Sequence, residues 1–238
     1  MNLNINLENI LFLDIETVPE YASWSTVSEK TKTLFEHKTA YQRKEDDTLE
    51  SFYNRAGIWA EFGKIICISV GFFTSEENKR QFRVKSFFGD DEKLLLEEFK
   101  DLLSNHFNLK QHVLCAHNGK EFDFPFIARR MIINRIDLPK KLNLFGKKPW
   151  EVPHIDTMEL WKFGDYKHYS SLKLLTSILD IPSPKDDIDG SEVGKVYYQE
   201  KNLGRIVQYC EKDTIAIAQL VLRFNNEDLL ESTQIIQS

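Results

Sequence analysis

Two carboxylates stand two residues apart near the start of the chain, at Asp14 and Glu16. They follow the apolar run 10–13, whose length and composition predict a strand buried on both faces. Side chains two apart on a strand point the same way, so both carboxylates should project together at its end. A hard divalent cation such as Mg²⁺, which prefers oxygen ligands, would offset their mutual repulsion. The alternative is a pair that caps a turn.

A third carboxylate, Asp123, follows another predicted strand at 112–116. Residues 118–123 read Asn-Gly-Lys-Glu-Phe-Asp, and a helix is expected to begin near Pro125. Asp123 could cap this helix, because carboxylates are stabilised at the positive end of a helix. It could equally join the first pair of carboxylates as a metal ligand.

Tyr209 and Asp213 are four residues apart on a predicted helix over 203–224, so they share one face. At 100° per residue, both polar side chains lie at the rim of the apolar stripe of this helix. That position suits groups held at the mouth of a cleft. A tyrosine at the edge of a core would follow the same pattern.

The remaining patterns predict the elements that must position these side chains. Apolar and alternating runs predict further strands over 65–73 and 82–88, and helical spacing predicts helices after Asp90-Asp91 and over 170–179. A long charged segment separates the first two strands, and we interpret residues 21–60 as a mostly helical insertion. Without internal repeats or breaks in composition, residues 1–238 are expected to form one domain.

Composition excludes several protein classes. The 238 residues carry a net charge of -6 with 42% hydrophobic residues, as in an ordinary soluble globular protein. No apolar run reaches the ~20 residues of a membrane span, and the start lacks the features of a signal peptide. The three cysteines form no C-x-x-C pair, so we expect neither a disulfide framework nor structural zinc, and a cytoplasmic location.

Taken together, three segments resemble the motifs of the DnaQ-like, DEDDy-type 3′–5′ exonucleases. The first is Leu-Asp14-Ile-Glu16-Thr17, the second runs from His117-Asn118 to Phe122-Asp123, and the third is Tyr209-Cys-Glu-Lys-Asp213. A tyrosine stands in the third motif where the sister subgroup has histidine. Residues 154–161 and 171–175 also resemble the proofreading exonuclease domain of family B DNA polymerases. The resemblance covers about residues 11–224 without an attached polymerase domain, so it implies a stand-alone exonuclease.

The resemblance implies an α/β fold, a ribonuclease H-like mixed five-stranded sheet flanked by helices. It implies hydrolysis at the 3′ end of nucleic acid with two Mg²⁺ or Mn²⁺ ions. By analogy, Asp14 bridges both ions, Glu16 and Asp213 complete the first ion's site, and Asp123 holds the second. Tyr209 would orient the attacking water or help to deprotonate it.

Three residues beside the motifs are candidates for contacting the terminal nucleotide. The resemblance implies a contact through the backbone of Thr17, while Asn118 and Phe122 lie within the second motif. Phe122 could stack on a base or belong to the core. Basic and aromatic residues over 129–150 could bind a single strand or form a solvated loop.

Single-stranded DNA is the favoured substrate, and an exoribonuclease or a catalytically silent nucleic-acid-binding module are the alternatives. The presence of all four carboxylates and the tyrosine favours activity. A doubly wound nucleotide-binding enzyme is disfavoured because no glycine-rich phosphate loop follows the first strand. The acidic net charge alone argues against nucleic acid. Two divalent ions would, however, add about +4 where the phosphate must lie.

Overall fold

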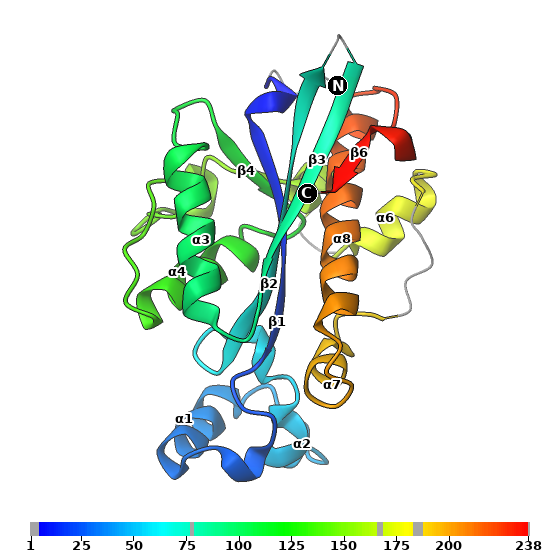
Figure 1. Cartoon of the computed structure of the whole chain (residues 1–238). Helices are drawn as coiled ribbons and strands as arrows, with labels where there is room; N and C mark the ends of the chain where they lie inside the picture. Colours follow the sequence, from blue (N-terminus) through cyan, green and yellow to red (C-terminus); the bar gives the residue numbers. More distant parts are fainter. Residues whose placement is uncertain (1–4, 77–78, 166–168, 183–187, 238) are drawn as a thin grey trace.

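A mixed β-sheet forms the centre of the protein, with helices on both of its faces. The computed structural model describes residues 5–76, 79–165, 169–182 and 188–237. Figure 1 shows α3 and α4 on one side of the sheet, and α6 and α8 on the other. The predicted α/β class is therefore confirmed.

The sheet contains six strands in the order β5-β4-β1-β2-β3-β6, rather than the five that we predicted. β1 and β2 pair antiparallel, as do β2 and β3, and the other neighbours are parallel. β5 and β6 are only two and three residues long, too short to show a periodic pattern in the sequence. The strand bounds are β1 Ile10–Pro19, β2 Gly63–Glu76, β3 Lys79–Phe88, β4 Val113–Ala116, β5 Ile155–Asp156 and β6 Ile235–Gln237.

The long helices lie close to their predicted positions, and the last of them spans the predicted 203–224. The α-helices are α1 Glu29–Thr39, α2 Leu49–Tyr53, α3 Glu92–Asn105, α4 Asp123–Ile133, α5 Thr157–Lys162, α6 Leu172–Ile178, α7 Val193–Tyr198 and α8 Leu203–Phe224. Short 3₁₀ turns are η1 Leu7–Asn9, η2 Trp24–Thr26, η3 Ala56–Ile58, η4 Pro149–Glu151 and η5 Ser232–Gln234.

The strand β1 runs through the middle of the core and separates two apolar clusters. Leu11, Leu13 and Ile15 are buried in the cluster that includes α3 and α4, whereas Ile10 and Phe12 are buried in the cluster that includes α8. The alternation of side chains along the strand produces this division. The same alternation puts the side chains of residues 14 and 16 on the α8 side.

β1 extends well past the apolar run from which we predicted it. Its pairing with β2 continues from Phe12↔Gly71 to Pro19↔Gly63. Asp14 and Glu16 consequently lie inside the strand and not beyond its end, which corrects our expectation. Ladder hydrogen bonds are made by the backbone, so polar side chains do not end a strand.

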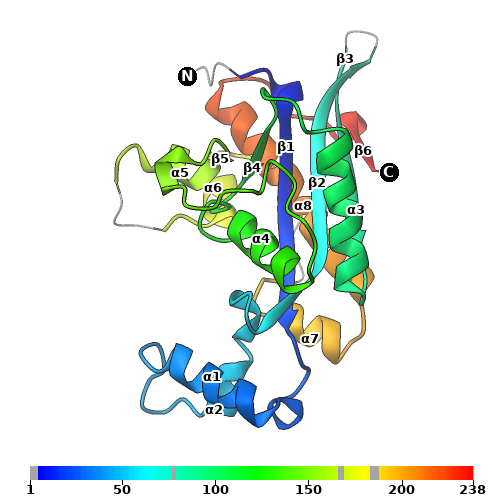
Figure 2. The ribbon, with the colours of Figure 1, turned by 90° about the vertical axis from the view of Figure 1, so that its left-hand side faces the viewer.

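Residues 21–60 leave the sheet at the end of β1 and return at the start of β2. They contain α1, α2 and the turns η2 and η3 around Phe35, which contacts the rings of Trp24, Phe52, Tyr53, Trp59 and Phe62. Figures 1 and 2 show this segment beyond the lower end of β1, away from α3 and α8.

Candidate active site

The first two carboxylates extend from the middle of β1 toward α8. Glu16 is only 7% exposed, and Asp14 is partly buried. A register shift between Glu16 and Thr17 interrupts the pairing with β2 at this point. A bulge locally bends and twists a strand, and such irregularities are frequent beside active sites.

The helix α8 faces these carboxylates with Cys210 and Asp213. The Cys210 thiol lies 3.4 Å from both the backbone oxygen and Oδ2 of Asp14. One ligand atom each of Asp14, Glu16 and Cys210 lie within 4.8 Å of one another. On the same helix, the Tyr209 hydroxyl hydrogen bonds the Asp213 carboxylate.

Asp123 is the first residue of α4 and is only 4% exposed. Its own backbone N–H and the N–H of Ile15 on β1 lie near its carboxylate and lower its pKa. It thus stabilises the helix N-terminus and also faces the strand that carries Asp14 and Glu16. The two roles that the sequence left open are compatible.

The electrostatics of the site favour a bound cation. Burial, together with the charges of Asp213, Glu16 and Asp123, raises the pKa of Asp14 well above its usual range. Burial and Asp213 do the same for Glu16, and no hydrogen bond within the described part of the chain offsets this effect. Burial raises the pKa of Asp123 to about 7. Carboxylates that repel one another in a buried place fit divalent metal ions with oxygen ligands.

The loop between β4 and α4 is held in place by Asp156. Its two carboxylate oxygens accept hydrogen bonds from the backbone N–H groups of Asn118 and Lys120, at 2.9 and 3.0 Å. Asp156 also caps α5, because its side chain accepts from the backbone N–H groups of Met158 and Glu159. Asn118 adopts a left-handed conformation with φ 63°, which asparagine tolerates better than most residues.

The residues predicted to contact substrate have mixed surroundings. The Thr17 hydroxyl donates to the Gly57 carbonyl at 2.8 Å. The Oδ1 atom of Asn118 is buried without a hydrogen-bond partner among the described residues. Phe122 is half-buried, and its ring centroid is 5.3 Å from that of Phe126, so it contributes to the core. Their roles toward substrate stay predictions.

Two residues near the acidic cluster were missed in the sequence. Cys210 directly follows Tyr209, and this position within the third motif was the one sign in the sequence that it lies near the acidic cluster. Tyr169 is 66% exposed. Desolvation is the largest cause of its raised pKa, and the charges of Asp123, Asp156 and Asp14 raise the pKa further. It precedes Ser170, whose carbonyl accepts a 2.8 Å hydrogen bond from His117. No motif spacing marks Tyr169.

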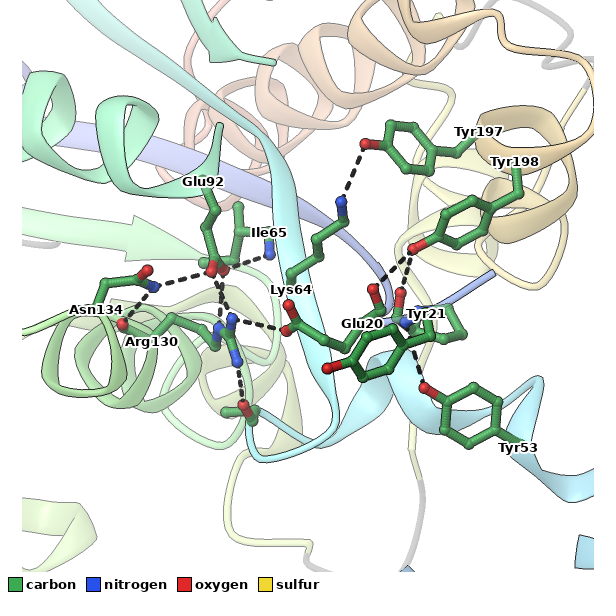
Figure 3. Close-up of polar contacts among 12 residues, drawn as sticks. Glu20, Tyr21, Tyr53, Lys64, Ile65, Glu92, Arg130, Asn134, Tyr197 and Tyr198 are labelled. Carbon is green, nitrogen blue, oxygen red and sulfur yellow. Dashed lines mark hydrogen bonds and ion pairs between the residues drawn. The ribbon is translucent and has the colours of Figure 1, made fainter. Parts of the chain in front are cut away.

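The far end of β1 is fixed from two sides (Figure 3). The buried guanidinium of Arg130 on α4 contacts both oxygens of Glu92, and it reaches Glu20 at 2.9 Å. From α7, the Tyr198 hydroxyl donates to the backbone oxygens of Pro19 and Glu20. These contacts tie the helix that begins with Asp123 to the strand that carries the other carboxylates.

The basic and aromatic residues over 129–150 lie in two different environments: some make contacts within the protein, and others are exposed. Arg130 is buried in ion pairs, and the Lys141 ammonium donates to the backbone oxygens of Leu109 and His112. Neither matches the expected phosphate-binding surface, because each already serves an internal contact. Phe145 and Trp150 are 74% and 77% exposed, as a stacking surface would require.

A family model described as the RNase H superfamily matches residues 55–237, which is more than half of the chain. The chain belongs to the RNase H superfamily. Nucleases of this superfamily act on nucleic acid, generally with divalent metal ions.

Membership in the RNase H superfamily agrees with the mixed sheet and with the acidic cluster. The matched range includes Asp123, Tyr209 and Asp213, whereas Asp14 and Glu16 precede it. In the structure, the strand β1 that carries Asp14 and Glu16 lies at the centre of the same sheet.

No helix in the described ranges is long and apolar enough to cross a membrane.

Proposed function

We propose that this RNase H superfamily member is a metal-dependent, DEDDy-type 3′–5′ exonuclease that removes nucleotides from single-stranded DNA. The observation that supports this proposal most strongly is the meeting of carboxylates from three distant segments. The charges of Asp213, Glu16 and Asp123 all raise the pKa of Asp14. Four carboxylates this close in a buried site are costly unless cations bind them.

In the proposed reaction, the four carboxylates would hold two Mg²⁺ or Mn²⁺ ions, which would supply activation of a water and neutralisation of the charge on the scissile phosphate. Asp14 would contact both ions, Glu16 and Asp213 the first, and Asp123 the second. All four residues offer the oxygen ligands that these ions prefer. The roles of the individual residues follow the resemblance in the sequence.

Tyr209 can orient the attacking water without losing its own proton. Burial and the neighbouring carboxylates raise its pKa far above the ordinary value, so the hydroxyl stays protonated at neutral pH. Its proton is directed to Asp213, which leaves the oxygen free to accept a hydrogen bond from a water. Bound cations would offset the carboxylate charges that raise this pKa, so positioning of the water and its deprotonation both stay predictions.

For the substrate, we propose that Thr17, Asn118 and Phe122 contact the terminal nucleotide. The buried Oδ1 of Asn118 is an acceptor in need of a donor, such as a sugar hydroxyl or a base amine. The exposed rings of Phe145 and Trp150 could stack on unpaired bases farther along the strand.

The direct test uses oligonucleotides of DNA and RNA labelled at either end, with Mg²⁺, Mn²⁺ or EDTA. We expect stepwise loss of the 3′ end that needs a metal ion and is lost in Asp14→Asn. The matched control is Asp101→Asn, which changes an exposed carboxylate on α3 and should keep full activity. Cleavage in EDTA, or an active Asp14→Asn variant, would contradict the proposal.

The same experiment separates the alternatives. Faster degradation of RNA than of DNA would identify an exoribonuclease. Binding of oligonucleotides without cleavage, under every metal condition, would identify a catalytically silent module.

A further inference from the structure

We propose that Asp14, Glu16 and Cys210 form a binding site for a thiophilic divalent cation such as Zn²⁺ or Cd²⁺, with the Cys210 sulfur as a ligand. This site shares two carboxylates with the proposed catalytic centre. Its binding can nevertheless be measured without any nuclease activity.

The separation of sulfur and oxygen in the site matches that required by a tetrahedral ion. Cys210 Sγ lies 3.4 Å from Asp14 Oδ2. Tetrahedral zinc, with bonds of about 2.3 Å to sulfur and about 2.0 Å to oxygen, separates the two ligand atoms by about 3.5 Å. A ligand atom of Glu16 lies within 4.8 Å of the other two, so a small local movement completes the set.

Glu16 supplies an independent reason to expect a cation here. Its side chain is 7% exposed and faces Asp14 and Cys210, and no hydrogen bond from the described residues compensates its charge. A buried, ionised carboxylate without a partner is unfavourable. An ion held between Glu16, Asp14 and Cys210 would remove that cost.

Binding through Cys210 requires its thiol to lose a proton. The Sγ–metal bond forms as the S–H bond breaks, and the proton is released to solvent. No electrons are transferred. Mg²⁺ needs no such step, because it is satisfied by the carboxylate oxygens alone.

Ligand softness determines which ions should use the thiolate. Sulfur ligands favour Zn²⁺ and Cd²⁺ over Mg²⁺. Such an ion would occupy Asp14 and Glu16 with a tetrahedral geometry, which differs from the octahedral geometry of Mg²⁺. It should therefore compete with the proposed catalytic ions rather than replace them in function.

Titration of the metal-free protein with Cd²⁺ tests the site through the ultraviolet thiolate-to-Cd²⁺ charge-transfer band. We expect one equivalent of Cd²⁺ to produce this band in the wild type. Cys210→Ser should abolish it and weaken Cd²⁺ binding by at least about tenfold. Cys115→Ser changes another buried cysteine, which lies outside this cluster, and should keep the band.

Absence of the band in the wild type, its persistence in Cys210→Ser, or its loss in Cys115→Ser would overturn the proposal. If Cys210→Ser fails to fold, Glu16→Gln provides the second test. This variant should keep the band but bind Cd²⁺ at least about tenfold more weakly, and unchanged affinity would contradict the site. Because these measurements need no substrate, failure of the proposed exonuclease activity would leave them interpretable.

Discussion

The backbone N–H of Ile15, the residue between Asp14 and Glu16, lies near the carboxylate of Asp123 and lowers its pKa. This contact joins the first residue of α4 to the middle of β1. The β4 pairing extends only to Phe12 on β1, so the Ile15 N–H faces the helix instead of a neighbouring strand. The end of a short parallel strand therefore leaves the space in which the carboxylates meet.

The stability of the metal-free protein should depend on pH through Asp123. Its pKa is about 7 in the folded protein, against an ordinary value of 3.8, because of burial. Between these values the folded state binds more protons than the unfolded state, so stability falls as pH rises from about 4 to about 7. In Asp123→Asn, this decrease in the free energy of unfolding should be smaller by on the order of 1 to 4 kcal/mol.

Urea unfolding in EDTA at about pH 5 and about pH 7.5 measures this effect. Asp101→Asn, on the exposed face of α3, serves as the control and should keep the wild-type dependence. An Asp123→Asn variant with the same pH dependence as the wild type would show that Asp123 titrates normally.

Removal of the Arg130 guanidinium should destabilise the protein strongly. Arg130→Met leaves Glu92 buried without its ion-pair partner, which typically costs about 3 to 5 kcal/mol. Adding Glu92→Gln should recover part of the loss, because glutamine is neutral and can still accept from the Ile65 N–H. Chemical denaturation measures both variants.

Arg129→Met is the matched control, since that neighbouring arginine is exposed. Its free energy of unfolding should change by less than about 0.5 kcal/mol. Equal stabilities of the Arg129 and Arg130 variants would refute the structural role of the ion pair.

Gly119 should tolerate no side chain in the loop that carries Asn118. A Cβ atom at this position would lie 2.4 Å from Ala116 Cβ and 3.0 Å from the Phe124 ring. Gly119→Ala should therefore cost about 1 to 3 kcal/mol of stability. Gly190→Ala, where nothing lies within 4 Å of the added Cβ, should be neutral in the same thermal unfolding experiment. Identical melting temperatures for the two variants would argue against this packing.

Much of the fold was predictable because long elements have a clear period. The apolar stripe of α8 and the buried strands β1 and β2 follow directly from residue spacing. The short strands β5 and β6 have no such signal, since their positions depend on pairing with β4 and β3. The inclusion of Asp14 and Glu16 within β1 likewise depends on the pairing of this strand with β2.

For the candidate site, the sequence suggested which carboxylates belong together but not how they are surrounded. The proximity of Asp14 to Cys210 depends on the packing of α8 against β1, which no local spacing specifies. Tyr169 and the Arg130 network were missed for the same reason. Lys141 shows the converse, since its charge suggested a contact with phosphate, whereas its ammonium donates to the backbone oxygens of Leu109 and His112.

The most direct test of the proposed exonuclease compares linear and covalently closed circular single-stranded DNA of the same sequence, with Mg²⁺ present. An exonuclease needs a free end, whereas an endonuclease with the same metal chemistry cuts both substrates. We predict that the linear strand is shortened from its 3′ end and that the circle stays intact. Cutting of the circle, or an intact linear strand with both Mg²⁺ and Mn²⁺, would contradict the account.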